Sequence, residues 1–163
     1  EDMPLLPNFT EQENLGLDIF MRGGNGATCQ YCHFTPQFVG PEARNNGLEM
    51  DYADKGKMEV TGNPAHNALF KAPSLRNIAL TAPYMHDGRF ATLREVVDHY
   101  SDNVVQHPSL HFRLTTVDDG PPGGPPMRLR LNNTEKEALI AFLHTLTDRS
   151  LATEEKYSNP FKQ

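Results

Sequence analysis

The sequence predicts a small all-α domain with long irregular loops. Three segments carry helix-start signals followed by apolar residues at helical spacing, whereas evidence for strands is slight. The region 34–75 shows no sustained period and is interrupted repeatedly by glycine and proline, so we expect an extended wrapping loop with short turns there. With 163 residues and 37% apolar side chains, the chain has the size of one domain, 1–163, and can bury a core.

Each predicted helix begins with a capping box. In this motif a threonine side chain accepts from the backbone three residues later, and a glutamate at that position pairs back to the threonine. The apolar stripe is clearest in the last of the three helices, which we expect to pack in the core. The three pairs and their helices are Thr10 with Glu13 for about 10–22, Thr92 with Glu95 for about 92–101, and Thr134 with Glu137 for about 134–147.

The charge of the chain limits its partners. A formal net charge of −6 and the absence of a lysine and arginine cluster argue against binding to nucleic acid or anionic membranes, because both depend on basic patches. No apolar run approaches the roughly 20 residues that span a bilayer, so no membrane span is expected. The chain opens with Glu1 and Asp2 instead of a basic and apolar leader, which is typical of a mature exported protein or an excised piece.

The segment TCQYCHF, residues 28–34, contains the only two cysteines. Two cysteines separated by two residues and followed at once by histidine form the attachment signature of c-type haem. The thiols add to the vinyl groups of the porphyrin, and the imidazole binds the iron. In a helical turn this spacing places both sulfurs at one edge of the ring. We therefore expect one covalent haem c, with Cys29 and Cys32 as thioether anchors and His33 as the proximal iron ligand.

Three other uses of the cysteine pair are less favoured. A zinc site would usually need a second Cys/His pair at knuckle spacing. A thioredoxin-type redox pair would lie in a βαβ context, and a Cys29–Cys32 disulfide would close a tiny loop and constrain little. Covalent haem instead uses every cysteine. It also predicts a cytochrome c-like arrangement, in which the helix before the motif packs against the C-terminal helix, and a periplasmic location.

The ligand on the other face of the iron would separate an electron carrier from a haem that binds peroxide or oxygen. Tyr100 lies near the middle of the apolar stripe of helix 92–101, whereas His99 is expected to face solvent or the flank of that stripe. Met85 lies in the tight turn TAPYMHDG, a common setting for a methionine ligand in small cytochromes. The residues alone leave both ligands open, and a buried tyrosine that serves only the core is the third alternative.

The run FKAPSLRNIALTAPYMHDGRFATLREVVDHY, residues 70–100, with TCQYCHF and LIAFLHTLTD, closely resembles the second haem domain of the bacterial di-haem cytochrome c peroxidase and MauG family. The similarity runs from about Phe9 to Phe161. It implies that this domain is the low-spin, electron-transfer half, and that a preceding domain carries the haem that reacts with hydrogen peroxide. It also implies a distal ligand on the helix after the turn. That ligand is methionine in the classical peroxidases and tyrosine in MauG-like members, and here the matching residue is Tyr100, with Met85 as the alternative.

The resemblance has further implications for the site. The carbonyls of Thr81 and Pro83 match positions that help bind an inter-domain calcium ion in the peroxidases. Lys71 and Arg76 are expected as partners of the haem propionates, because a partly buried carboxylate needs a charge-assisted donor; an ordinary surface salt-bridge role is the alternative for both. A tyrosine ligand would favour the ferric iron and lower the reduction potential, whereas a thioether would raise it.

The chain departs from the family pattern because it has one haem motif where the enzymes have two, and it has no tryptophan. Two functions follow. The chain is the electron-transfer domain of a di-haem peroxidase or MauG-like oxidoreductase, with a second haem domain or chain as partner and a small redox protein as donor. Alternatively, it is a stand-alone periplasmic mono-haem electron carrier. In both, this domain alone is expected only to transfer electrons. An exposed apolar patch near 81–88 would favour the first function, and a polar surface the second.

Overall fold

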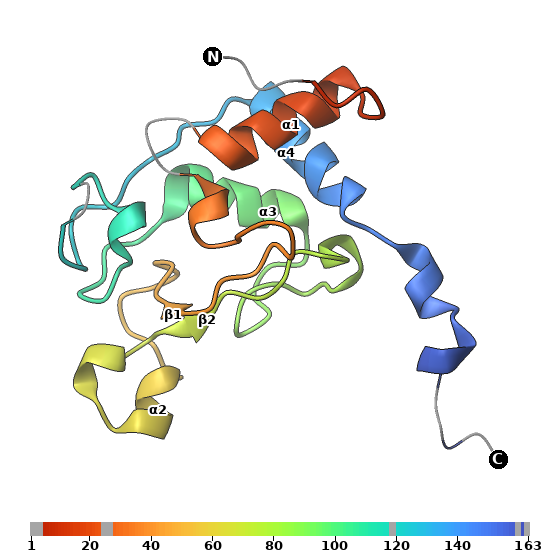
Figure 1. The fold of residues 1–163 in the computed structure, drawn as a ribbon. Helices are drawn as coiled ribbons and strands as arrows, with labels where there is room; N and C mark the ends of the chain where they lie inside the picture. The colour runs from red at the N-terminus through yellow and green to blue at the C-terminus, as the bar shows by residue number, and fades with distance from the viewer. Residues whose placement is uncertain (1–4, 24–27, 118–119, 159–160, 162–163) are drawn as a thin grey trace.

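The computed structural model describes residues 5–23, 28–117, 120–158 and 161, apart from the side chain of Ala152. These residues form a mostly helical fold with a small two-stranded sheet, so the all-α expectation was wrong in that detail (Figure 1). The helices are α1 (Glu11–Arg22), α2 (Lys57–Thr61), α3 (Leu93–Asp98) and α4 (Asn133–Thr145), and the strands are β1 (Ala43–Arg44) and β2 (Phe70–Lys71). Short 3-10 turns cover Cys29–Tyr31, Pro64–His66, Ile78–Leu80, Phe112–Leu114, Arg149–Ala152 and Glu155–Tyr157, and a π-helical turn covers His99–Asn103.

The main core lies between α1 and α4, which pack side by side (Figure 1). The rings of Phe20 and Phe142 are 5.2 Å apart between centroids, and both side chains are almost fully buried. Gly16 faces α4 so closely that an added Cβ would lie 1.9 Å from the carbonyl oxygen of Ala138. The backbones of α1 and α4 can pack this closely because residue 16 has no side chain.

The capping boxes of Thr10 with Glu13 and Thr92 with Glu95 are present at the starts of α1 and α3. The box predicted for the last helix is wrong by two residues. Asn132 caps α4, its side chain accepting from the backbone nitrogen of Glu135 at 3.0 Å, while the Glu135 carboxylate accepts from the backbone nitrogen of Asn132 at 2.7 Å. Asparagine is at least as good an N-cap as threonine, so the earlier start is favoured. Glu137 is then left to pair with Arg94 of α3 at 2.7 Å.

The region 34–75 is irregular apart from β1, α2, β2 and the Pro64–His66 turn. β1 and β2 pair antiparallel, with Ala43 opposite Lys71 and Arg44 opposite Phe70. Asn45 follows β1, is fully buried, and donates its side-chain amide to the carbonyl oxygen of Ala68 at 3.1 Å. The strand pairing and the Asn45–Ala68 hydrogen bond therefore join the segment around 43–45 to the segment around 68–71. This gives the residues just after β1 a defined position.

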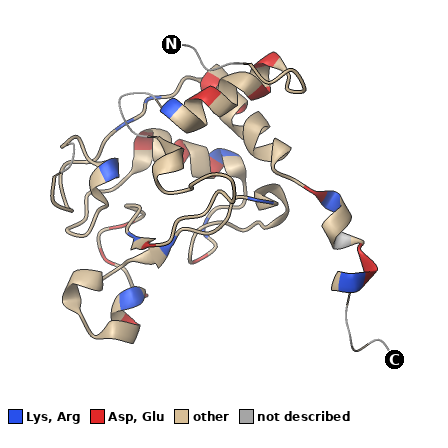
Figure 2. Ribbon diagram, viewed as in Figure 1, with Lys and Arg blue, Asp and Glu red and all other residues tan. Residues whose placement is uncertain are grey.

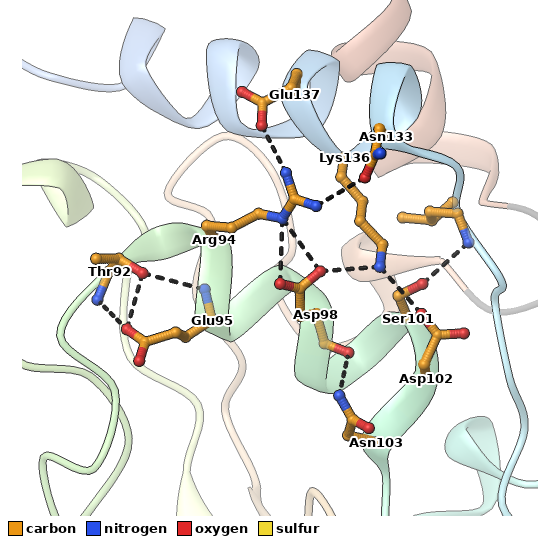
Figure 3. A network of polar contacts seen from close by, with 11 residues as sticks. Thr92, Arg94, Glu95, Asp98, Ser101, Asp102, Asn103, Asn133, Lys136 and Glu137 are labelled. Atoms are coloured by element: carbon orange, nitrogen blue, oxygen red, sulfur yellow. Dashed lines mark hydrogen bonds and ion pairs between the residues drawn. The ribbon is translucent and has the colours of Figure 1, made fainter.

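Ionic contacts fasten α3 and the π turn to α4. Figure 3 shows Lys136 of α4 reaching between Asp98 and Asp102, with its ammonium nitrogen 2.8 Å from Asp98 Oδ1 and 3.0 Å from Asp102 Oδ2. The Lys136 side chain is only 12% exposed. On the same surface the guanidinium of Arg94 pairs with Asp98 at 3.1 Å and with Glu137. These contacts hold the segment on either side of position 100 against α4.

Beyond α4, residues 149–158 lead away from the helical body as an arm (Figure 1). Leu151 and Tyr157 on this arm are exposed. Figure 2 shows lysine and arginine scattered among acidic residues over the body and the arm. Within the described residues, no helix is both long and apolar enough to cross a membrane.

The close contact at Gly16 predicts that a Gly→Ala substitution in α1 will lower the free energy of unfolding instead of raising it. In an exposed helix, Gly→Ala should stabilise by roughly 0.5–1 kcal/mol, because glycine loses more backbone entropy on folding. Here we expect Gly16→Ala to destabilise by at least about 1–3 kcal/mol, because the new methyl group overlaps the Ala138 carbonyl. Urea unfolding measures the change. Gln12→Ala, at an exposed position of α1, is the control and should be neutral or slightly stabilising; a stabilised Gly16→Ala variant would disprove the close approach.

The Lys136 contacts predict an acid-sensitive contribution to stability. Lys136 is the main cause that holds the pKa of Asp98 below its usual range, and it follows Ser101 as a cause for the lowered pKa of Asp102. Because both carboxyl pKa values are lowered by folding, their contribution is complete above about pH 4 and is lost as the pH falls through the folded values.

We expect Lys136→Met to lower the free energy of unfolding at pH 7 by about 0.5–1 kcal/mol, since the carboxylates are partly exposed. The difference from wild type should shrink as the pH falls below about 4. Lys57→Met, at an exposed position of α2, is the control and should leave stability unchanged. A difference that is constant with pH would contradict an ionic origin.

Candidate functional site

The cysteine motif forms a single tight turn. The backbone nitrogens of Cys32 and His33 both donate to the carbonyl oxygen of Cys29, at 3.1 and 3.0 Å. Both thiols are free and partly buried. Burial, with a smaller contribution from Cys32, raises the pKa of Cys29 to about 12, and burial also raises the pKa of Cys32. The turn therefore presents two neutral thiols and an imidazole from three positions of one short segment.

The imidazole of His33 is oriented by two backbone carbonyls. Its Nδ1 lies 3.1 Å from the carbonyl oxygen of Pro73 and 3.3 Å from that of Phe38. Because both neighbours are acceptors, Nδ1 carries the proton, and Nε2 is the nitrogen with a lone pair. Burial lowers the pKa of His33, so the ring is held neutral. A neutral ring whose Nδ1–H is bound to a carbonyl is the arrangement that metal-ligating histidines use.

Tyr100 lies in the π turn that continues α3. Its hydroxyl oxygen accepts from the side-chain nitrogen of Asn46 at 3.2 Å. Burial raises the pKa of Tyr100 to about 12, and the thiols of Cys32 and Cys29 add smaller contributions to the rise. The partly buried phenol therefore lies close enough to the cysteine turn to interact electrostatically with both thiols, and the structure brings Cys29, Cys32 and Tyr100 into one neighbourhood.

The expectation for His99 was wrong. Its side chain is only 3% exposed, and its Nε2 lies 3.0 Å from the carbonyl oxygen of Asn46. The expectation assumed a uniform α-helix at 100° per residue, but the helix widens into a π turn from His99 onward. A π turn holds more residues than an α turn, so consecutive side chains at positions 99 and 100 can both be directed inward.

Met85 and Tyr100 share one hydrogen-bond partner, the side chain of Asn46. The Met85 sulfur accepts from the same Asn46 nitrogen at 3.5 Å, and the Met85 side chain packs against the small buried cluster of Leu48, Tyr52 and Ala68. The backbone of Met85 has φ +73°, a left-handed conformation that non-glycine residues rarely adopt. The two sequence-predicted alternatives for the distal ligand thus lie next to each other.

Buried polar atoms near the cysteine turn fit a bound anionic group. Arg44 is mostly buried, with Nη1 3.6 Å from the sulfur of Cys32 and 2.9 Å from His111 Nε2. Within the described residues, Arg44 Nε and Thr28 Oγ1, which can both donate, are buried and have no hydrogen-bond partner; the amide oxygen of Gln30, an acceptor, has none either. Unpaired buried donors are costly, so Arg44 Nε is a donor available to a carboxylate such as a haem propionate.

The other predicted propionate partners lie farther out. Lys71 is exposed on β2, and Arg76 is exposed with its Nη2 donating to the carbonyl oxygen of Pro36 at 2.9 Å. Among the described contacts, neither makes a hydrogen bond or ion pair with the cysteine turn or Tyr100. Sequence reasoning missed Arg44, because only the pairing of β1 with β2 and the position of the following loop place this arginine beside the motif.

Thr81 and Pro83 are exposed, and within the described residues neither carbonyl oxygen accepts a hydrogen bond. A nearby acidic group, Glu49 with His86 and Asp87, has ligand atoms within 4.8 Å of one another. Its two carboxylates are paired with the guanidinium of Arg89, at 2.9 Å for Glu49 and 2.6 Å for Asp87. This group is therefore an ion-pair cluster that braces the turn.

The chain is similar to known proteins over most of its length. The chain is 31% identical to the methylamine utilization protein MauG of Paracoccus denitrificans (strain Pd 1222), over 86% of this chain and 43% of MauG. It is 34% identical to the cytochrome c551 peroxidase of Nitrosomonas europaea, over 86% of this chain and 36% of the peroxidase. A solved MauG-like protein associated with microbial copper homeostasis superposes with a TM-score of 0.70 and 34% identity, over 95% of this chain and 49% of that protein. No protein-family model matches the chain.

The matches cover most of this chain, which spans less than half the length of these relatives. They include both branches that the sequence motifs indicate, the MauG proteins and the cytochrome c peroxidases. The chain belongs to the bacterial MauG and di-haem cytochrome c peroxidase family.

Proposed function

We propose that this chain is the haem c electron-transfer domain of a di-haem oxidoreductase, with a cytochrome c-like arrangement around one haem. It would pass electrons to or from a peroxide-reactive haem in a second domain. The observation that supports the proposal is that the partly buried Tyr100 phenol lies close enough to the cysteine turn for the Cys29 and Cys32 thiols to contribute to its raised pKa, while a backbone carbonyl orients His33 of the same turn. Haem c, when bound, supplies one-electron redox chemistry.

The residues of the chain have separate roles in this proposal. Cys29 and Cys32 would anchor the porphyrin through thioethers, and His33 would bind the iron through Nε2 with its Nδ1–H on a carbonyl. Tyr100 would supply the second iron ligand, with Met85 as the alternative. Arg44 would hold a propionate, and Lys71 and Arg76 stay as predicted outer partners. An oxygen ligand from Tyr100 would favour the ferric state and so suit a haem that stores oxidising equivalents.

The partner we infer is a second haem domain, because the chain spans less than half of its relatives. The exposed residues at and just before the 81–88 turn include the apolar Leu80, Ala82 and Pro83, together with the polar His86 and Asp87. The carbonyls of Thr81 and Pro83 would bind a calcium ion there together with groups of the partner. A small redox protein would donate electrons, and the periplasm is the location that covalent haem implies.

A stand-alone mono-haem electron carrier is the second candidate. It is favoured by the polar, exposed His86 and Asp87 at the turn where a partner domain would dock. In this case the same residues would hold the haem, and the chain would exchange electrons only with small redox proteins.

The tyrosine assignment predicts a spectroscopic change. In the haem-loaded protein, Tyr100→Phe should abolish the low-spin ferric signal of the histidine–tyrosine pair, because the variant lacks the ligand oxygen. Electron paramagnetic resonance and optical spectra measure it. Tyr84→Phe is the matched control, since Tyr84 is buried and its hydroxyl donates to the carbonyl oxygen of Ile78 and not to a predicted haem ligand; its spectrum should equal that of wild type. An unchanged Tyr100→Phe spectrum would remove Tyr100 as a ligand.

The mass of the native protein separates the two functions. Mass spectrometry of the protein isolated from its own cells should find a longer chain or a tight complex with two covalent haems. A native chain of this length that carries one haem and has no haem-bearing partner would instead establish the mono-haem carrier. A native chain without covalent haem would overturn both.

A further inference from the structure

Asn46 contacts both alternatives for the distal ligand. Its side-chain nitrogen lies 3.2 Å from the hydroxyl oxygen of Tyr100 and 3.5 Å from the sulfur of Met85. Its carbonyl oxygen accepts from His99, the residue before Tyr100. Asn46, in the loop after β1, therefore forms hydrogen bonds with His99 and Tyr100 of the π turn and with Met85 of the 81–88 turn.

The loop holds Asn46 rigidly. On one side, the side chain of Asn45 donates to the Ala68 carbonyl and accepts from the backbone nitrogen of Gly47 at 2.8 Å. On the other side, the carbonyl oxygen of Gly47 accepts from Val105 at 2.7 Å. Gly47 has φ +68°, and a Cβ there would lie 2.6 Å from the Val105 carbonyl oxygen. The direction of the Asn46 amide is thus determined by fixed backbone on both sides.

The chemistry of the amide group treats the two acceptors unequally. The nitrogen has two protons, so it can donate to the phenol oxygen and the thioether sulfur at the same time. A phenolate oxygen is a strong acceptor and a thioether sulfur a weak one, and a hydrogen bond to an ionised acceptor is roughly twice as strong as a neutral one. Donation from Asn46 therefore stabilises Tyr100 in the form that binds iron, and it occupies a lone pair of the Met85 sulfur.

We propose that Asn46 is a positioning residue that selects Tyr100 over Met85 as the distal haem ligand. This inference rests on the proposed function, because it requires Tyr100 at the iron. Asn46 itself touches no reacting atom; it acts through the two side chains that it holds.

The test uses the haem-loaded protein and four variants: Asn46→Leu, Met85→Leu, the double variant Asn46→Leu/Met85→Leu, and Tyr100→Phe. Asn46→Leu keeps the size of the side chain and the carbonyl that binds His99, but it removes both donor protons. We expect the ratio of thioether-ligated to phenolate-ligated haem to rise roughly tenfold or more, because a hydrogen bond to a charged group contributes on that order. Magnetic circular dichroism and electron paramagnetic resonance measure the ratio, and redox titration should find a second, higher potential.

The double variant separates ligand selection from support of the fold. With the competing sulfur removed, Asn46→Leu/Met85→Leu should return to uniform phenolate ligation, and Met85→Leu alone should keep it. An Asn46→Leu spectrum identical to wild type would overturn the proposal. So would a double variant whose spectrum shows the same mixture of haem ligation states as Asn46→Leu. Tyr100→Phe is read separately. If it leaves the wild-type spectrum unchanged, the ligand assignment fails; if it abolishes the phenolate signal while Asn46→Leu changes nothing, only the role of Asn46 fails.

A measurement on the unmodified protein covers the case in which the variants do not fold. Resonance Raman spectra of the wild-type ferric protein in H₂O and D₂O should differ in the iron–phenolate vibration, because an exchangeable proton of Asn46 is bonded to the ligand oxygen. A phenolate vibration without an isotope shift would overturn the proposal.

Discussion

The close contact of α1 with α4 is the constraint on which the geometry of the site depends. Gly16 lets the backbones approach, and α1 also contacts the Cys29–Tyr31 turn, which His33 follows closely. On its other side α4 binds the ligand segment through Lys136, which joins Asp98 and Asp102 (Figure 3). One helix therefore determines how far the proximal turn lies from the segment that presents Tyr100. A shift of α4 would move the two proposed haem ligands, His33 and Tyr100, relative to each other.

The π turn at His99–Asn103 gives the site its second particular feature. The wider turn brings residues 99 and 100 closer together around the helix axis than an α-helix would, and the side chains of both contact Asn46. His99 uses this to bond the backbone of Asn46, and Tyr100 uses it to reach the side chain of the same residue. The irregular helix, the loop after β1 and the Met85 turn thus meet at a single asparagine.

The polar groups around the motif fit the proposed cofactor. Two carbonyls determine which nitrogen of His33 carries the proton, and the guanidinium of Arg44 has a nitrogen without a partner among the described residues. Burial keeps the thiols, the imidazole and the phenol neutral in the absence of a metal. A bound metal ion lowers the pKa of its ligands, so Tyr100 would become a phenolate at the iron. The burial that raises the pKa of the free phenol would then keep solvent away from that phenolate.

The sequence by itself determined the features that depend only on residues close together in the chain. The CxxCH spacing, the capping boxes of α1 and α3, and the motifs that identify the family are all local, and the structure retains the two boxes. The start of α4 was misjudged because two capping boxes overlap there, and His99 because a π turn has no local signal that a uniform helical period can detect. Only the tertiary structure placed Arg44 beside Cys32 and Asn46 beside Tyr100, which is 54 positions later in the chain. The physical reason is that the position of each of these side chains is determined by backbone hydrogen bonds between distant loops, whose partners no short stretch of sequence specifies.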